Sequence, residues 1–206
     1  MAWLVLGISG VTCGGKTTIT KLLQDYLGDL ANKNILNDNI TIKSVKMVSQ
    51  DDYFWPVDSP HHTLCDHLNH INWEILSSMD MDRMCNDLKE LIGHESNLYR
   101  RQSSDVPMDL NILIIEGFLI FNHPAIFDLC QIKFHLHLPY EECYRRRSNR
   151  VYDPPDVVGY FEGYVWPLYE KHFRKFSESG EVIMLNGSMS REKCFVFVLN
   201  CIRNSI

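Results

Sequence analysis

The chain lacks the features of secreted, disulfide-rich and membrane-spanning proteins. Its seven cysteines are odd in number and form no Cys-x-x-Cys pair, so neither a disulfide framework nor a cysteine zinc site is indicated. No basic stretch followed by a long apolar run opens the chain, and the most apolar interior run, residues 112–121, is broken by Glu116 and Gly117. We therefore expect a cytoplasmic protein without a membrane partner.

Positive charge is also scarce. The 206 residues carry 20 Lys and Arg against 26 Asp and Glu, which gives a net charge of -6 and a pI near 5.8. A general nucleic-acid binder would show a basic field, so no nucleic-acid partner is expected. Repeats and low-complexity segments are absent, and the length with 45% hydrophobic residues fits a single α/β domain over residues 1–206. Nothing in the sequence indicates the oligomeric state.

A phosphate-binding motif lies near the start of the chain. Residues 10–17 follow the pattern GxxxxGKT, and the apolar stretch 3–9 before them predicts the strand that the motif requires. Apolar residues at helical spacing over 19–27 predict a helix after the loop. Backbone N–H groups, the helix N-terminus and a lysine then converge on one anion, a nucleotide phosphate. The predicted donor-binding residues are Gly10, Thr12, Gly14, Gly15, Lys16, Thr17 and Thr18, and the Thr17 hydroxyl is a candidate ligand of Mg²⁺.

Strands and helices alternate along the chain. Further strands are predicted at 40–49, 111–115, 131–137 and 182–185, and helices at 73–78, 80–92, 141–150, 160–176 and beyond a turn at 186–187. Polar connections are expected at 28–39, 55–69 and 93–109. The alternation predicts a parallel sheet with helices on both faces, a three-layer α/β fold.

Acidic residues follow two of the predicted strands. Asp51 and Asp52 come after 40–49, and Glu116 comes after 111–115. Ligands of open α/β sheets bind beyond the carboxyl ends of the strands, so these carboxylates belong to the same edge as the phosphate loop. Adjacent residues point to opposite sides, so one of the two aspartates faces the site and can accept the proton of an acceptor hydroxyl. Glu116 is predicted to hold Mg²⁺ through a water or to orient the acceptor; a turn-capping aspartate and a solvent-facing glutamate are the alternatives.

Arginines follow the strand at 131–137. Arg146 and Arg150 lie four residues apart and Arg147 and Arg150 three apart, so the predicted helix brings them to one face. The Pro-Pro pair that follows offers a hinge for a lid over about 145–158, although a solvated charged face is the alternative. With the loop, a metal and an acceptor base, such cations complete the requirements of phosphoryl transfer.

Two further groups of residues have a less specific pattern. Trp73 and Tyr152 are candidates to stack on a planar ring, but a single aromatic residue is more often part of a core. A set rich in histidine contains metal-ligating residue types, but its spacing matches no zinc pattern and no metal site is expected there. These residues are His61, His62, Cys65, Asp66, His67 and His70.

Five segments together resemble the nicotinamide riboside kinases, a branch of the uridine-kinase-like P-loop kinases. The segments are GISGVTCGGKTT, SQDDYF, IIEGFLIF, PYEECYRRRSNRVYDPPD and GYFEGYVWPLY, of which the last two are the most specific. The resemblance implies a P-loop kinase fold with a small helical lid and an acceptor-side insertion at about 53–109. It also implies transfer of the ATP γ-phosphate to the 5′-hydroxyl of nicotinamide riboside, and of nicotinic acid riboside, for NAD salvage, with Mg²⁺ as cofactor. The choice between ATP and GTP as donor stays open.

On the acceptor side, the resemblance implies five site residues. Asp51 resembles the general base of the family. Trp73 and Tyr152 are similar to the aromatic residues that sandwich the nicotinamide ring, which suits a cationic pyridinium. Arg147 with Glu74 resembles the pair that binds the riboside hydroxyls, although the family often has aspartate at the position of Glu74.

On the donor side, Lys16 resembles the phosphate lysine and Thr17 with Glu116 resembles the magnesium-associated pair. Arg146 and Arg150 are similar to the lid arginines that bind the ATP phosphates.

Three segments depart from the family pattern. Trp55 replaces a lysine, residues 186–190 replace a more usual Asp-Gly-Thr-Lys-Ser near the expected adenine pocket, and the histidine-rich 61–70 loop is unlike the family. The alternatives are a uridine or cytidine kinase, which the Trp73 and Tyr152 pair disfavours, and a GTP-dependent switch, which would need an Asn-Lys-x-Asp motif that is absent. A scaffold without catalysis is the third, and nothing in the sequence favours it.

Overall fold

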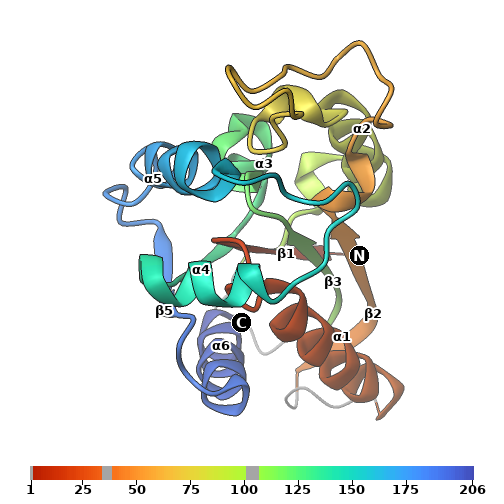
Figure 1. Ribbon diagram of the computed structural model, residues 1–206. Helices are drawn as coiled ribbons and strands as arrows, with labels where there is room; N and C mark the ends of the chain where they lie inside the picture. The colour runs from red at the N-terminus through yellow and green to blue at the C-terminus, as the bar shows by residue number, and fades with distance from the viewer. Residues whose placement is uncertain (1, 34–38, 101–106) are drawn as a thin grey trace.

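The described part of the chain, residues 2–33, 39–100 and 107–206 of a computed structural model, contains one sheet of five parallel strands (Figure 1). The strands are β1 (Ala2–Gly10), β2 (Ile40–Ser49), β3 (Met108–Glu116), β4 (Ile132–His137) and β5 (Val182–Asn186), in the order β2-β3-β1-β4-β5. All four pairings are parallel, which confirms the prediction of a parallel sheet.

Helices cover both faces of this sheet (Figure 1). On one face, α1 (Lys16–Lys33) and α6 (Arg191–Ser205) pack against Leu4, Leu6 and Ile8 of β1. On the other, α2 (Met81–Ile92), α3 (Pro124–Leu129) and the end of α5 (Trp166–Phe173) pack against a core that includes Val5. Successive side chains of a strand point to opposite faces, so β1 contributes to both cores. The predicted three-layer fold is confirmed.

A third, smaller core lies next to the phosphate loop. It joins α4 (Tyr140–Ser148) to the π-helical turn Phe161–Val165 that precedes α5. Val11 of the loop packs there with Cys143 of α4 and with Tyr160, all three fully buried. Residues 149–159, which connect the two helices, are therefore anchored at both ends beside the loop.

Four predicted helices differ from the structure. The first, predicted over 19–27, continues to Lys33 as α1, so residues 28–33 are helical and not part of the polar connection predicted at 28–39. Over 73–78 only the 3₁₀ turn Leu76–Ser78 forms, because Trp73 and Glu74 lie in a turn, where the Glu74 amide donates to the Asn72 side chain at 3.1 Å, and Ile75 is extended. The helix predicted at 141–150 ends at Ser148, where the Asn149 side chain donates to the Arg145 carbonyl at 2.7 Å and satisfies a helix-end acceptor. The helix predicted at 160–176 begins with the π-helical turn, and its α-helical part ends at Phe173.

Helix α3 was not predicted; it begins at Pro124, a residue suited to the first helical position. Parts of the connections predicted at 28–39 and 93–109, and of the insertion predicted at about 53–109, fall on residues 34–38 and 101–106, outside the described residues. In the described ranges, none of the helices combines the length and the apolarity that crossing a bilayer requires.

Candidate active site

The phosphate loop follows β1 and folds around Lys16. The amide of Val11 donates to the Leu136 carbonyl at 3.0 Å, and that of Gly14 donates to the Val11 carbonyl at 3.1 Å. Gly15 has φ +98°, a left-handed conformation that favours glycine. The Lys16 ammonium donates to the carbonyls of Gly10 and Val11 at 3.0 and 3.1 Å. Burial lowers the pKa of Lys16, while the nearby charges of Asp51 and Glu116 act to raise it.

Oxygen atoms of Thr17, Glu116 and Ser49 meet beside the loop. The Thr17 hydroxyl lies 3.1 Å from both carboxylate oxygens of Glu116, and the Ser49 hydroxyl donates to one of them at 3.2 Å. Ser49 is also the register partner of Glu116 between β2 and β3. Carboxylate and hydroxyl oxygens are ligands that suit Mg²⁺, so the set fits this cation. Ser49 was not predicted, because the sequence does not show which strands are neighbours.

The two aspartates after β2 have different surroundings. They lie in the 3₁₀ turn Gln50–Tyr53, and Asp51 lines a cleft of about 400 Å³ above the phosphate loop. Asp52 is exposed and does not line the cleft; its carbonyl accepts from Arg83 of α2 at 2.7 Å. The buried Gln50 side chain accepts from the Leu119 amide at 2.9 Å and fixes the start of the turn. The structure thus turns one aspartate of the pair toward the cleft.

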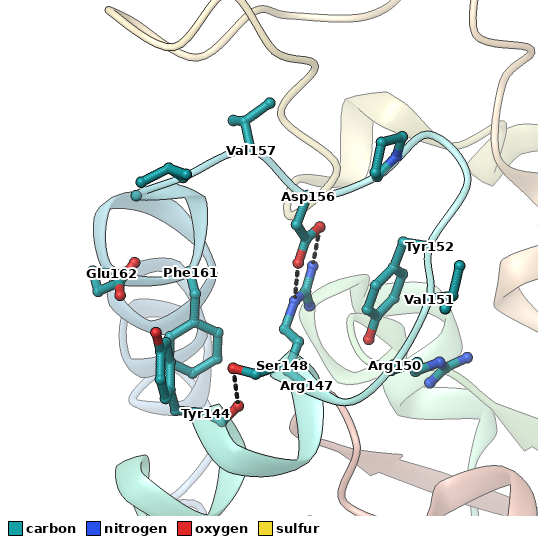
Figure 2. A pocket seen from close by; sticks show the side chains of 13 residues that line it. Tyr144, Arg147, Ser148, Arg150, Val151, Tyr152, Asp156, Val157, Phe161 and Glu162 are labelled. Atoms are coloured by element: carbon teal, nitrogen blue, oxygen red, sulfur yellow. Dashed lines mark hydrogen bonds and ion pairs between the residues drawn. The ribbon is translucent and has the colours of Figure 1, made fainter.

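Arg147 joins three segments at the floor of this cleft. Its guanidinium donates two hydrogen bonds to the Asp156 carboxylate, at 2.7 and 3.1 Å, and one to the Thr12 hydroxyl at 3.1 Å. A Glu74 oxygen lies 3.5 Å away. Figure 2 shows the paired Arg147 and Asp156 groups with the Tyr152 ring beside them. The family resemblance implied Arg147 and Glu74 as a pair, but nothing in the sequence indicated Asp156, the closest partner.

Burial and charge act in opposite directions on this pair. Burial raises the pKa of Glu74, and the charge of Arg147 counteracts the rise. Burial by itself would lower the pKa of Arg147, but the hydrogen bond with Asp156 and the charge of Glu74 raise it overall. Arg147 therefore carries its charge in a buried place, 7% exposed, where ion pairs and hydrogen bonds are strongest.

Arg146 and Arg150 do not share one helix face, so that prediction was wrong. Arg146 lies on α4, donates to the carbonyls of Cys13 and Gly187 at 3.2 and 3.1 Å, and lines a second cavity of about 170 Å³. Arg150 lies beyond the end of α4 and lines the main cleft. The helix ends before Arg150, and the two side chains approach the phosphate loop from different directions.

Aromatic residues form part of the cleft. Trp73 contacts the rings of Phe54 and His62 edge to face, with centroids 5.5 and 4.7 Å away. The guanidinium of Arg147 lies 4.5 Å from the centroid of the Tyr152 ring. Burial raises the pKa of Tyr152 to about 12, and its hydroxyl lies 3.2 Å from that of Thr12. Trp73 and Tyr152 therefore line one space without being in contact with each other.

The structure brings most predicted site residues to one of the two cavities. The main cleft is lined by Thr12, Lys16, Thr17, Asp51, Trp73, Glu74, Arg147, Arg150 and Tyr152. The second cavity is lined by Gly14, Gly15, Thr18 and Arg146. Gly10 contacts Lys16, and Glu116 contacts Thr17. A third cavity, of about 470 Å³, lies between α4 and residues 151–159 and shares Arg147, Arg150, Tyr152 and Asp156 with the main cleft (Figure 2). In the described residues, no group of three or more His, Cys, Asp or Glu side chains is placed to hold a metal ion, and this includes the histidine-rich loop.

Comparisons with known proteins identify the family. Residues 6–166 match a family model described as an AAA domain. The chain is 35% identical to nicotinamide riboside kinase 1 of Homo sapiens, over 96% of this chain and 91% of that one. It is 33% identical to nicotinamide riboside kinase 1 of Mus musculus, over 100% and 97%. The chain belongs to the nicotinamide riboside kinase family. The resemblance stated from the sequence is confirmed, and membership of this family makes the chain a kinase.

More distant proteins share the fold of this nicotinamide riboside kinase family member. A uridine kinase of Chlamydia pneumoniae is 23% identical, over 89% of this chain and 82% of that one. The solved structure of a sugar kinase from Janibacter sp. superposes with a TM-score of 0.57 at 13% identity, over 97% and 94% of the two chains. At this identity the structural likeness shows the P-loop kinase fold alone.

Proposed function

We propose that the chain transfers the γ-phosphate of ATP to the 5′-hydroxyl of nicotinamide riboside, and of nicotinic acid riboside, to form the mononucleotides used in NAD salvage. One observation carries the proposal: the cleft of about 400 Å³ joins the phosphate loop, an aspartate and two aromatic residues in a single space. Kinases named for nicotinamide riboside are also 33–35% identical to the chain over nearly its full length. The same cleft therefore provides for both the phosphate donor and the acceptor.

The acceptor side suits a cationic ring on a ribose. Trp73 and Tyr152 line the cleft, and aromatic rings attract a pyridinium more strongly than a neutral pyrimidine; Arg147 and Arg150 already lie 4.5 and 5.0 Å from the centroid of the Tyr152 ring. Arg147 and Glu74 offer a donor and an acceptor for ribose hydroxyls, and Asp156 fixes the Arg147 guanidinium. Asp51 lies in the same cleft and serves as the base that accepts the proton of the 5′-hydroxyl.

The donor side places cations where a triphosphate would bind. Lys16 and the loop amides bind the β- and γ-phosphates, Arg146 approaches from α4, and Arg150 approaches from the cleft. Thr17 and Glu116 would hold Mg²⁺, which neutralises charge on the phosphates when it is bound.

Residues 145–158 act as the lid in this proposal, and residues 1–206 form one kinase domain. The hydrogen bonds of Arg147 to Asp156 and Thr12 support the lid, because they link this segment to the phosphate loop. All seven cysteines are free thiols in the part of the chain that the structure describes, which supports the cytoplasm as compartment.

A kinetic panel tests the function. The purified chain is incubated with Mg·ATP and nicotinamide riboside, nicotinic acid riboside, uridine or cytidine, and product formation gives kcat/KM for each. We expect the two pyridine ribosides to be preferred. A preference for uridine or cytidine would keep the phosphoryl transfer and overturn the acceptor assignment. No product with any of the four would contradict the proposed activity, and the same panel with GTP measures the donor preference.

A further inference from the structure

One side chain of the histidine-rich loop, His62, contacts residues that line the acceptor cleft. We propose that His62 is a positioning residue of the acceptor site, which holds Trp73 and the backbone of Trp55 and Pro56 together as adjoining sides of the cleft. The inference rests on the proposed function, because it concerns how the acceptor of that reaction is bound. It gives a role to a loop that departs from the family pattern.

The first observation is the ring contact between His62 and Trp73. Their centroids are 4.7 Å apart with an interplanar angle of 68°, an edge-to-face arrangement. Phe54 contacts the Trp73 ring in the same manner, at 5.5 Å and 83°. Two rings from the segment after β2 therefore restrict the orientation of the Trp73 indole. An acceptor ring that stacks on Trp73 meets a surface already held in place, which lowers the entropy lost on binding.

The second observation is a pair of hydrogen bonds from the same imidazole. The Nε2 atom of His62 lies 2.9 Å from the Pro56 carbonyl oxygen and 3.2 Å from that of Trp55. Carbonyl oxygens only accept, so Nε2 carries the proton and donates to both. Trp55 and Pro56 line the main cleft together with Trp73. His62 thus connects two sides of the cleft that are not adjacent in sequence.

The third observation is the other ring nitrogen. Nδ1 of His62 is buried and has no hydrogen-bond partner among the described residues. A phenylalanine would make the ring contact without burying an unpaired nitrogen, and a glutamine would donate to the carbonyls without a ring. Histidine combines the ring and the donor in one compact side chain at this position. The neighbouring His61 stacks on Trp55 at 4.4 Å but is exposed and has no contact with Trp73.

The test compares three substitutions of His62 with a control in the same loop. In His62→Ala we expect the KM for nicotinamide riboside to rise about tenfold, the equivalent of ~1.4 kcal/mol, with kcat and the KM for ATP changed by less than about twofold. His62→Gln keeps the donor and His62→Phe keeps the ring, so each should raise the KM by only about threefold. His67→Asn is the control: His67 is exposed, and asparagine tolerates its φ of +73°. It should leave both constants unchanged.

Binding is also measured without turnover, from the change in tryptophan fluorescence when nicotinamide riboside is added. The Kd should rise by the same factors as the KM. Far-UV circular dichroism melts identify any variant that fails to fold. If His62→Ala does not fold, the KM values of His62→Gln and His62→Phe test the inference. Equal losses of kcat, ATP affinity and riboside affinity would indicate a general structural role and overturn the inference.

The outcomes separate this inference from the proposed function. If the wild type uses nicotinamide riboside and His62→Ala has an unchanged KM, the inference is wrong and the function stands. If the wild type uses only uridine, the proposed acceptor is wrong, and the same series with uridine tests His62: a selective rise in its KM supports positioning and an unchanged KM overturns it. If the wild type neither binds nor phosphorylates any of the four ribosides, both are overturned.

Discussion

Asp51 and Asp52 show how strongly position controls the role of a side chain. They are adjacent and chemically identical, yet Asp51 lines the main cleft whereas the carbonyl of Asp52 is bound by Arg83 at the outer side of the turn. A carboxylate can act as a base only where it reaches the reacting hydroxyl. Asp52 is therefore a matched control for Asp51, with the same residue type, sequence context and charge.

Replacement of these aspartates by asparagine should give opposite results. In Asp51→Asn we expect kcat to fall by about 100- to 10,000-fold, because the amide cannot accept the proton of the acceptor hydroxyl. The Kd for ATP should stay near that of the wild type. Asp52→Asn removes the same charge and should retain kcat within about twofold. Single-turnover kinetics and a nucleotide-binding titration measure both quantities, and an active Asp51→Asn variant would rule out the base assignment.

The predictability of site residues depends on whether one contiguous pattern contains them. Lys16 and Thr17 belong to such a motif, and the structure places both at the cleft. Asp156 belongs to no such motif. It bonds to Arg147 from the segment 149–159, which forms no helix or strand, so no periodic pattern relates the two residues. Ser49 meets Glu116 only through the register of β2 and β3. Long-range pairs of this kind can be recognised only when the three-dimensional structure is known.

At the scale of elements, the ends of β2 and β3 are joined by Gln50 and Gly117. The fully buried Gln50 side chain lies so close to Gly117 that an added Cβ would overlap its Cβ and Oε1 atoms and would also contact Ile120. The Gly117 amide donates to the Ile8 carbonyl at 3.2 Å, which connects this point to β1. The absence of a side chain at Gly117 thus allows three strand ends to meet beneath the turn that carries Asp51.

Two glycine-to-alanine substitutions should have opposite effects on stability. Gly117→Ala should lower the free energy of unfolding by about 3 kcal/mol, because buried backbone and Gln50 must shift to admit the methyl group. Gly28→Ala, in α1, has no atom within 4 Å of the added Cβ and should raise stability by about 0.5 kcal/mol through helix propensity. Urea unfolding measures both. A Gly117→Ala protein as stable as the wild type would show that the close packing at this point is not required.

Elements were predictable where a local pattern determines them. The strands are apolar runs bounded by polar residues, and all five predicted strands agree with the structure to within a few residues. The helix predicted at 73–78 did not form because the tertiary contacts of Trp73 with Tyr160 and of Glu74 with Arg147 outweigh the local pattern. Helix α3 is only six residues long, too short for a period to be recognised. Arg150 was misplaced because a side-chain bond from Asn149 ends α4 early.

At the scale of the whole molecule, the helical layer containing α5 is held to the sheet partly by a buried histidine. His135 of β4 is 1% exposed and packs against Phe173, Phe176 and Tyr169, whose hydroxyl lies 3.2 Å from its Nε2 atom. Burial lowers the pKa of His135 from 6.5 to about 3, and the charge of Lys16 acts in the same direction. The fold therefore holds this imidazole neutral well below pH 6.5.

This histidine makes stability fall in acid. Between pH 6.5 and about 3 the unfolded chain binds a proton at His135 that the folded protein does not. This group therefore leaves the free energy of unfolding unchanged above pH 6.5 and lowers it as the pH falls below that value. The loss from this group at pH 5 is about 2 kcal/mol, at 1.36 kcal/mol per pH unit. Urea unfolding at pH 7 and pH 5 measures it. His135→Phe should reduce the loss by that amount; a loss in His135→Phe equal to that of the wild type would show that other groups cause it.

The strand order also determines when the phosphate loop takes its final form during synthesis. β1 is made before β3 and β4, its neighbours in the sheet, and the Val5 amide donates to a Gln131 side chain 126 residues later. The Val11 amide, inside the loop, donates to the Leu136 carbonyl. While β4 is still inside the ribosome, the nascent chain lacks the Gln131 and Leu136 partners of β1 and the loop. Contacts between residues so distant in sequence also form slowly. The phosphate loop is thus completed only after β4 has joined the sheet, so nucleotide binding reports that β1, β3 and β4 have assembled.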